Sequence, residues 1–189
     1  MLILASESPR RRQLLADLGF PFAIRKPQVD EMEHPVNGCS VFDIPRKNAL
    51  LKAVAVADAN PNALVVGSDT VIVFNGSMIG KPRDLEDARR ILLRLSGAAH
   101  HVVTGVALVR RGSHPVEISW EERSEVVFKK LSPRDVERYI EKVNVLDKAG
   151  AYAVQEYGSM IISGISGDMN NIIGLPLRRL ACEIARHLE

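Results

Sequence analysis

The sequence of 189 residues predicts an α/β fold in which helices flank a central sheet. Short apolar runs, such as those over 2–5 and 64–66, alternate with stretches whose apolar residues recur at helical spacing. This alternation is typical of α/β and α+β domains. The chain has no internal repeat, low-complexity tract or long polar linker, so we expect a single domain over 1–189.

The first half of the chain carries clear signals for helix ends. Ser8 followed by Pro9 is typical of a helix start, where serine is the N-cap and proline takes the first helical position. Gly19 supplies the matching end signal. Together with the apolar runs, these signals predict strands over 2–5 and 22–26 and helices over 9–19 and 43–59.

The second half is richer in strand patterns. The apolar residues 64–66 predict a buried strand, and the chain stays extended through the polar motif at 67–70 to Phe74. Asn75 and Gly76 then form a hairpin turn signal, and Asp84 is the N-cap of a helix that Gly97 ends. The remaining expected elements are strands over 101–109, 116–128 and 159–165 and helices over 132–143 and from 176 onward.

Composition and charge exclude several classes of protein. Lysine and arginine total 25 and aspartate and glutamate 23, so the net charge of +2 provides no global basic surface for nucleic acid. No apolar run reaches the about 18 residues of a membrane span, and the amino terminus lacks the pattern of a secretory signal. Cys39 and Cys182 match no metal-ligand or redox spacing. We expect a cytoplasmic protein with no stable nucleic-acid partner and no membrane association.

The first candidate for chemistry is the segment 6–12 at a predicted strand-to-helix junction. Free N–H groups at a helix start suit a phosphate, and Arg10 and Arg11 add bidentate donors. Because successive helical residues lie about 100° apart, at most two of the three arginines there face one ligand. A solvated helix surface is the alternative, although each positive charge at a helix start costs about 0.3–1 kcal/mol without an anion.

Asp69 in the motif Gly67-Ser68-Asp69-Thr70 is the second candidate. It lies at the end of the Val-rich run that predicts a buried strand, and α/β sheets open their ligand crevice at strand ends. A carboxylate there can hold a divalent cation or accept a proton from water. A turn or N-cap aspartate is the alternative.

Two loops near these elements hold further charged candidates. Lys81 follows the predicted hairpin and could reach a phosphate, although Pro82 and the spacing from Gly76 exclude a P-loop. Asp30 and Glu31 lie in the long polar loop 28–40 and could ligate Mg²⁺. An exposed lysine and a solvated acidic loop are the alternatives.

The long loop 144–158 combines Lys148, Tyr152 and Gln155, which suit charge balance, stacking and pairing with a nucleotide. Elsewhere, no serine lies in a nucleophile elbow, neither cysteine has a local catalytic signature, and the histidines lack zinc-site spacing. Basic groups and carboxylates remain, and with Mg²⁺ they suit hydrolysis of a phosphate anhydride.

Several motifs stand in an order known from one family: Leu4-Ala5-Ser6-Glu7-Ser8-Pro9-Arg10-Arg11, Asp30-Glu31, Lys52-Ala53, Val66-Gly67-Ser68-Asp69-Thr70, Gly80-Lys81-Pro82, Leu95-Ser96-Gly97, Thr104-Gly105-Val106, Asp147-Lys148-Ala149-Gly150-Ala151-Tyr152 and Gly174-Leu175-Pro176-Leu177. The set resembles the Maf family of nucleoside triphosphate pyrophosphatases over almost the whole chain. The resemblance implies the mixed α/β fold of the inosine triphosphatases (the Maf/Ham1 fold), with two lobes around a substrate cleft, and commonly a homodimer. It also implies hydrolysis of a nucleoside triphosphate to the monophosphate and pyrophosphate with Mg²⁺ or Mn²⁺.

The resemblance further implies roles for individual residues. Asp69 matches the proton acceptor, and Glu31 together with Asp69 is expected to hold the metal. Thr after the aspartate and Gln at the end of the later loop resemble the branch that acts on dTTP and UTP. We therefore expect hydrolysis of dTTP and UTP, and clearance of modified nucleotides as a further role. The positions matching substrate choice are Arg10, Thr70 and Gln155. Those expected around phosphates and metal are Ser6, Arg11, Glu31, Lys52 and Lys81. We expect Lys81 and Glu31 to be catalytic with Asp69, and Lys148 to bind substrate.

Two residues depart from the family pattern. Met169 stands where the family usually has Tyr, and Asn48 stands where an apolar residue is usual. We expect neither to touch Asp69, although Met169 bears on the breadth of substrates. Two alternatives to a dTTP/UTP pyrophosphatase stay open: an enzyme for 7-methylguanosine or another non-pyrimidine triphosphate, and a non-enzymatic, nucleotide-binding regulator of cell division.

Overall fold

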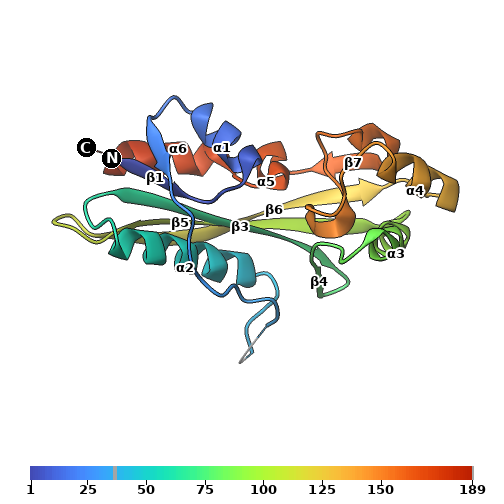
Figure 1. Ribbon diagram of the computed structural model, residues 1–189, viewed down its shortest axis with the longest axis horizontal. Helices are drawn as coiled ribbons and strands as arrows, with labels where there is room; N and C mark the ends of the chain where they lie inside the picture. Colours follow the sequence, from blue (N-terminus) through green and yellow to red (C-terminus); the bar gives the residue numbers. More distant parts are fainter. Residues whose placement is uncertain (36–37, 189) are drawn as a thin grey trace. The chain divides into compact units, whose positions relative to one another are not determined.

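The computed structural model describes residues 1–35 and 38–188 and contains a mixed sheet (Figure 1). The strands are β1 (Leu2–Ala5), β2 (Phe22–Ile24), β3 (Leu64–Phe74), β4 (Ser77–Ile79), β5 (Ala99–Arg110), β6 (Val116–Phe128) and β7 (Ile162–Ser166). They are ordered β2-β1-β3-β5-β6-β7, and β4 pairs with β3. β1 runs parallel to β2 and β3, whereas β4 is antiparallel to β3 and β7 to β6. The expected mixed α/β fold is therefore confirmed.

Six α-helices occur within the described residues, and their starts follow the expected signals. Ser8, Asp84 and Ser132 each accept a backbone N–H from the first turn that follows them. These bonds satisfy donors that a helix start otherwise leaves free. The helices are α1 (Pro9–Ala16), α2 (Ile44–Asp58), α3 (Leu85–Leu95), α4 (Pro133–Ile140), α5 (Met169–Ile173) and α6 (Leu177–His187).

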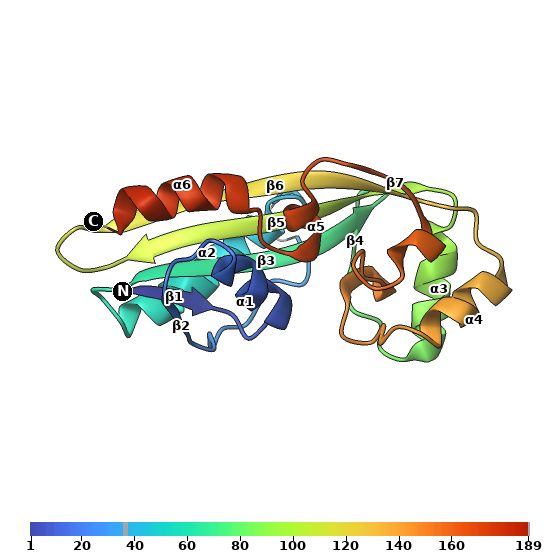
Figure 2. The same ribbon diagram turned by 90° about the horizontal axis from the view of Figure 1, so that it is seen from above.

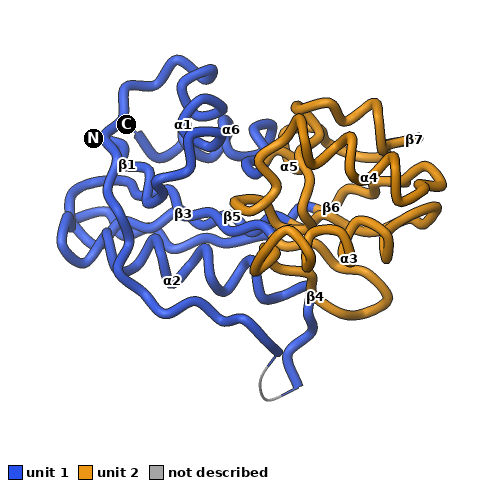
Figure 3. The backbone as a smooth tube through the Cα atoms, turned by 45° about the vertical axis from the view of Figure 1, so that its right-hand side comes forward, with its two compact units in different colours: residues 1–70, 104–122, 174–189 blue, residues 71–103, 123–173 orange. Residues whose placement is uncertain are grey.

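The chain divides into two compact units (Figure 3). Unit 1 comprises Met1–Thr70, Thr104–Glu122 and Gly174–Glu189, and unit 2 comprises Val71–Val103 and Arg123–Ile173. β3, β5 and β6 contribute residues to both units. Within the described residues, no helix has the length and hydropathy needed to cross a lipid bilayer.

Unit 1 is a sheet covered on both faces. α2 lies along one face, and α1 and α6 cover the other (Figures 1 and 2). The contact with α2 is close because two glycines leave room for its backbone. A Cβ on Gly67 would lie 2.1 Å from the carbonyl oxygen of Ala49, and one on Gly105 would lie 2.2 Å from the backbone nitrogen of Arg46. Glycine at these positions therefore sets the depth at which α2 sits on the sheet.

Unit 2 has its own apolar core, to which β3, β5, β6 and helices α3 and α4 contribute. Leu92 of α3 and Tyr139 of α4 are fully buried in this core. The predicted hairpin joins β3 to β4 through Asn75 and Gly76, which both have positive φ, at 49° and 74°. Two residues with positive φ match the right-handed twist of the flanking strands.

Several expected boundaries were wrong by a few residues. α1 ends at Ala16, three residues before Gly19, and α4 ends at Ile140, three before residue 143. The strand expected over 159–165 begins at Ile162, because 158–160 forms a 3₁₀ turn. The short helix α5 was missed. Of the expected loop 28–40, residues 36 and 37 lie outside the described residues.

Candidate functional site

Asp69 lies inside a strand, not at its end as the sequence suggested. It is the sixth of the 11 residues of β3, because the chain continues extended from Leu64 to Phe74. The parallel partner β1, however, ends at Ala5, which lies opposite Gly67. Asp69 therefore follows the carboxyl end of the β1–β3 pair.

Strand alternation separates the polar residues of the motif. Gly67 and Asp69 share one side of β3, and Ser68 and Thr70 share the other. The contacts agree with this: Gly67 meets α2, and Asp69 binds side chains of α2, whereas Ser68 and Thr70 bind Gly174 and Arg11. The motif consequently presents a carboxylate to one face of the sheet and two hydroxyls to the other.

On the α2 face, two side chains hold the carboxylate of Asp69. Lys52 Nζ lies 2.9 Å from Oδ1 and Asn48 Nδ2 lies 3.0 Å from Oδ2. Asn48 and Lys52 are four residues apart on α2, so they occupy adjacent turns on the same side of the helix. All three side chains are buried.

The Lys52 ammonium also binds Glu31, whose Oε2 lies 2.8 Å from Nζ. Lys52 thus bridges two carboxylates, one buried on β3 and one half exposed in the segment before α2. That segment is tied to α2 a second time, because the Met32 N–H donates to Asn48 Oδ1 at 2.8 Å. Glu31, Lys52 and Asp69, which the sequence singled out separately, are brought together.

The charges around Asp69 keep it ionised. Burial by itself would raise the pKa of this carboxyl. The charges of Lys52 and Arg11, together with hydrogen bonds from Lys52 and Asn48, outweigh burial and hold the pKa below its ordinary value. Asp69 is therefore a carboxylate at neutral pH.

On the opposite face, Arg11 is the centre of a hydrogen-bond cluster. Its Nη2 donates to Thr70 Oγ1 at 3.0 Å, its Nε to the Gly174 carbonyl at 3.0 Å and its Nη1 to Ser6 Oγ at 3.4 Å. Ser68 Oγ donates to the same carbonyl at 3.0 Å. The cluster joins β3, the start of α1 and the loop before α6, so it fixes Ser6, Arg11 and Thr70 relative to one another.

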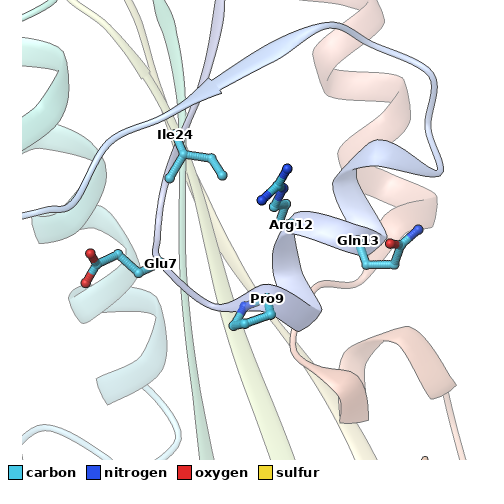
Figure 4. A pocket seen from close by; sticks show the side chains of 5 residues that line it. All are labelled: Glu7, Pro9, Arg12, Gln13 and Ile24. Atoms are coloured by element: carbon cyan, nitrogen blue, oxygen red, sulfur yellow. The ribbon is translucent and has the colours of Figure 1, made fainter.

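The three arginines at the start of α1 face different surroundings, as the helical spacing predicts. Arg11 points into the cluster just described, whereas the exposed Arg12 lines a hollow with Glu7, Pro9, Gln13 and Ile24 (Figure 4). Arg10 is half-buried. A single ligand therefore meets only part of this basic segment.

Lys81, Lys148 and Gln155 belong to unit 2. Lys81 and Gln155 are exposed, and the loops that carry Lys81 and Lys148 are joined by a bond from the Gly150 N–H to the Gly80 carbonyl at 2.9 Å. Lys148 is buried, and its ammonium lies 2.7 Å from the Asn144 carbonyl, 2.8 Å from Asp147 and 3.3 Å from Glu156. These three acceptors match its three N–H donors, so Lys148 braces its own loop.

Asn48 is the functional neighbour that the sequence missed. We expected no contact with Asp69, and this was wrong, because the Asn48 amide donates directly to the carboxylate. The signal was available: an amide one helical turn before Lys52, on the apolar face of α2, requires a buried polar partner. Met169, the other departure, is exposed at the start of α5 in unit 2.

The residues near Asp69 suit a hard cation that is coordinated partly by the protein and partly by a substrate. Asp69 and Glu31 offer two carboxylates, the ligands that Mg²⁺ prefers, on either side of the Lys52 ammonium. No group of three or more His, Cys, Asp or Glu side chains suited to one metal occurs in residues 1–35 and 38–188. In phosphate chemistry, phosphate oxygens and water usually complete the coordination of Mg²⁺.

Comparisons with known proteins identify relatives of similar sequence. The "dTTP/UTP pyrophosphatase" of Symbiobacterium thermophilum is 45% identical over 178 residues, which cover 94% of this chain and 89% of the relative. The protein of the same name from Akkermansia muciniphila is 43% identical over 178 residues, covering 94% and 91%.

A solved structure shows the same fold. The HAM1 protein from Coxiella burnetii superposes with a TM-score of 0.56 over 98% of each chain, at 15% identity. This likeness confirms the expected Ham1-like architecture. The sequence model of the family described as "Maf-like protein" matches residues 1–187. With a match over nearly its whole length and relatives above 40% identity, the chain belongs to the Maf-like protein family.

Proposed function

We propose that the protein is a nucleoside triphosphate pyrophosphatase that hydrolyses dTTP and UTP to the monophosphate and pyrophosphate. The observation that carries the proposal is an ionised, buried Asp69 beside the Lys52 ammonium and near the Arg11 guanidinium. A carboxylate that stays ionised is available to accept a proton, and the fixed cations around it suit binding of a polyanion. The relatives that bear the name dTTP/UTP pyrophosphatase support the same activity.

The proposed reaction is attack of water on the α-phosphorus. A bond forms between the water oxygen and the α-phosphorus, and the bond from that phosphorus to the bridging oxygen breaks, so pyrophosphate leaves. Asp69 accepts the proton of the water. Although Lys52 and Asn48 each occupy one lone pair of its oxygens, a carboxylate has about four acceptor positions, so it can accept a further hydrogen bond.

Cationic side chains would neutralise the charge that grows on the triphosphate. Lys52 binds Asp69 directly, and the charge of Arg11 acts on Asp69 from the other face of the sheet. We assign Arg10 and Lys81 to the same task. Ser6 supports Arg11 through its hydroxyl oxygen. Electrostatic stabilisation of this kind is often the largest single contribution to an enzymatic rate.

We propose that Asp69 and Glu31 hold Mg²⁺ or Mn²⁺ when substrate is bound. The cation would act as a Lewis acid on phosphate oxygens. Both carboxylates are in place around Lys52, so a cation would compete with, or lie beside, this ammonium.

Recognition of the base is assigned to Arg10, Thr70 and Gln155. An amide such as that of Gln155 can donate to one atom of a pyrimidine edge and accept from another. Lys148 contributes indirectly, by bracing the loop that ends in Gln155.

We further propose that the protein is a homodimer and acts in the cytoplasm, where it also clears modified nucleotides. Both cysteines are free thiols, which suits a reducing compartment. The near-neutral net charge of +2 argues against stable nucleic-acid binding. Light scattering on the purified protein tests the dimer, and a monomer over the working concentration range would contradict it.

A panel of triphosphates with detection of released pyrophosphate tests the function. With Mg²⁺ or Mn²⁺ present, dTTP and UTP are expected to give the highest kcat/KM and to yield pyrophosphate, not orthophosphate. Dominance of 7-methylguanosine triphosphate or another non-pyrimidine nucleotide would contradict the base assignment. Nucleotide binding without any metal-dependent release of pyrophosphate would favour the regulatory role.

A further inference from the structure

Asn48 joins three separate parts of unit 1. This side chain of α2 is 2% exposed and uses both ends of its amide. Oδ1 accepts the Met32 N–H at 2.8 Å, while Nδ2 donates to the Met32 carbonyl at 3.1 Å and to Asp69 Oδ2 at 3.0 Å. One amide, carried by α2, thus binds both the segment before that helix and strand β3.

This arrangement uses every hydrogen-bonding group that the amide nitrogen offers. An amide carries two N–H donors, and here one goes to a backbone carbonyl and the other to a carboxylate. A bond to a charged acceptor in a buried place is worth more than a neutral one, and a buried amide without partners is costly. These hydrogen bonds therefore hold Asn48, Met32 and Asp69 in fixed positions relative to one another.

The two bonds to Met32 bear directly on Glu31. Both the N–H and the C=O of Met32 bind the same side chain, which fixes the backbone next to Glu31. The Glu31 side chain itself is half exposed and reaches Lys52. Asn48 therefore fixes the position of the backbone from which the Glu31 side chain reaches Lys52.

We propose that Asn48 is a positioning residue that sets the orientation of the Asp69 carboxylate and holds the Glu31 segment in register with it. The inference rests on the proposed function for its catalytic consequence. Lys52 fixes Oδ1 of Asp69 and Asn48 fixes Oδ2, so the plane of the carboxylate is defined at both oxygens. Without Asn48, rotation of the carboxylate about the Lys52 contact becomes free, and Met32 loses two bonds.

The test compares Asn48→Leu with Asn48→Asp and with a control, Asn60→Leu. Leucine keeps the volume and removes all three bonds, whereas aspartate keeps an acceptor for the Met32 N–H and loses the donor to Asp69. Asn60 donates to the Val56 carbonyl of α2 and not to Asp69, so its variant measures the effect of losing an amide away from the site. The assay is pyrophosphate release from dTTP with Mg²⁺.

A positioning role predicts a split between the kinetic constants. We expect kcat of Asn48→Leu to fall about 10- to 100-fold, the range typical of residues that orient a reacting group, with KM changed less than about threefold. Asn48→Asp is expected to fall at least as far, and Asn60→Leu to keep the kcat of the natural protein. An unchanged kcat in a folded Asn48→Leu protein would overturn the proposal.

A double variant separates positioning from general damage. If Asn48 acts through Asp69, adding Asn48→Leu to Asp69→Asn changes the residual single-turnover rate by less than about twofold. A further loss as large as that in the natural background would show that Asn48 does not act through Asp69, and would overturn the proposed orientation of the carboxylate.

A readout without substrate covers the case in which the proposed function fails. Amide hydrogen exchange at Met32 is expected to accelerate at least tenfold in Asn48→Leu and much less in Asn48→Asp, which keeps the acceptor. Equal exchange in all proteins would overturn the register role. Absence of pyrophosphate release by the natural protein would instead overturn the proposed function, while the exchange result stands by itself.

Discussion

Gly67 and Asp69 lie on the same side of β3 and both face α2. Gly67 leaves room for the backbone of this helix, whereas the carboxylate of Asp69 binds two of its side chains. The missing side chain of Gly67 admits the backbone of α2, since a Cβ there would lie 2.1 Å from the Ala49 carbonyl oxygen. Two residues on, Asp69 meets Asn48 and Lys52 of the same helix. The glycine thus sets the depth of α2, and that depth brings the amide and the ammonium within reach of the carboxylate.

Gly67→Ala is expected to reduce both stability and activity. The added methyl group must push α2 away from β3, which costs about 1–3 kcal/mol of unfolding free energy, as overpacking of a dense interior does. The same displacement lengthens the contacts of Lys52 and Asn48 with Asp69, so kcat falls about tenfold or more. Urea unfolding and pyrophosphate release measure the two effects.

Gly164→Ala is the matched control, because a Cβ on Gly164 would meet only an ordinary contact with Val127 at 3.9 Å. Its kcat should equal that of the natural protein. Equal stability and kcat in the Gly67 variant would contradict the account of how α2 is seated.

His100 makes stability depend on pH in the mildly acidic range. It is buried between Phe128 and Tyr152, and its Nε2 lies 2.8 Å from the Tyr152 hydroxyl. Burial, with a smaller effect of His101, lowers the pKa of His100 to about 4 from its ordinary 6.5. The unfolded chain therefore binds more protons than the folded one between these values, so stability falls as the pH drops through this window.

The expected loss attributable to His100 is on the order of 3 kcal/mol between about pH 6.5 and 4. Urea unfolding at pH 7 and 4.5 measures it as the difference between the natural protein and His100→Gln. The variant should show a shallower pH dependence, whereas His114→Gln, an exposed histidine, should not. Identical slopes in the natural protein and His100→Gln would contradict the burial argument.

Gln155 tests the assignment of base recognition. Gln155→Ala removes a donor and an acceptor from the proposed pyrimidine contact, so KM for dTTP is expected to rise about tenfold, the equivalent of one good hydrogen bond. kcat should change less, because the phosphates and Asp69 are not altered. Steady-state kinetics with dTTP and UTP provide the measurement.

Gln13→Ala serves as the control for this prediction. Gln13 binds Asp17 at the surface of α1, 2.9 Å from its carboxylate, and should have no influence on KM. A KM for dTTP that is the same in the Gln155 variant and in the natural protein would remove Gln155 from base recognition.

Much of the fold could be predicted because its signals are local. The N-caps Ser8 and Asp84 and the turn at Asn75 and Gly76 each follow from the chemistry of one or two residues, and each occurs where expected. The helix over 43–59 was placed within one residue at each end. The strand order was beyond prediction, because β1, β3 and β5 pair across long stretches of sequence.

The sequence singled out candidate site residues one by one but did not predict their arrangement. Asp69, Lys52 and Glu31 were found from motifs, yet their ion pairs depend on how deeply α2 packs on β3, which is a property of the fold. Asn48 was judged remote from Asp69 because a single polar residue on a helix face does not reveal its partner. Lys148 was expected to bind substrate. Its ammonium binds Asp147 and Glu156 of its own loop, and the sequence did not identify these partners.

The activity of Asp69→Asn tests the central claim most directly. Asparagine keeps the shape of the side chain and removes the charge and the basic oxygen, so pyrophosphate release from dTTP should fall at least about 10³-fold, with circular dichroism unchanged. Asp87→Asn, a carboxylate paired with Arg83 and Arg90 on α3, should retain the natural rate. Turnover of Asp69→Asn close to that of the natural protein would contradict the claim that this carboxylate accepts the proton.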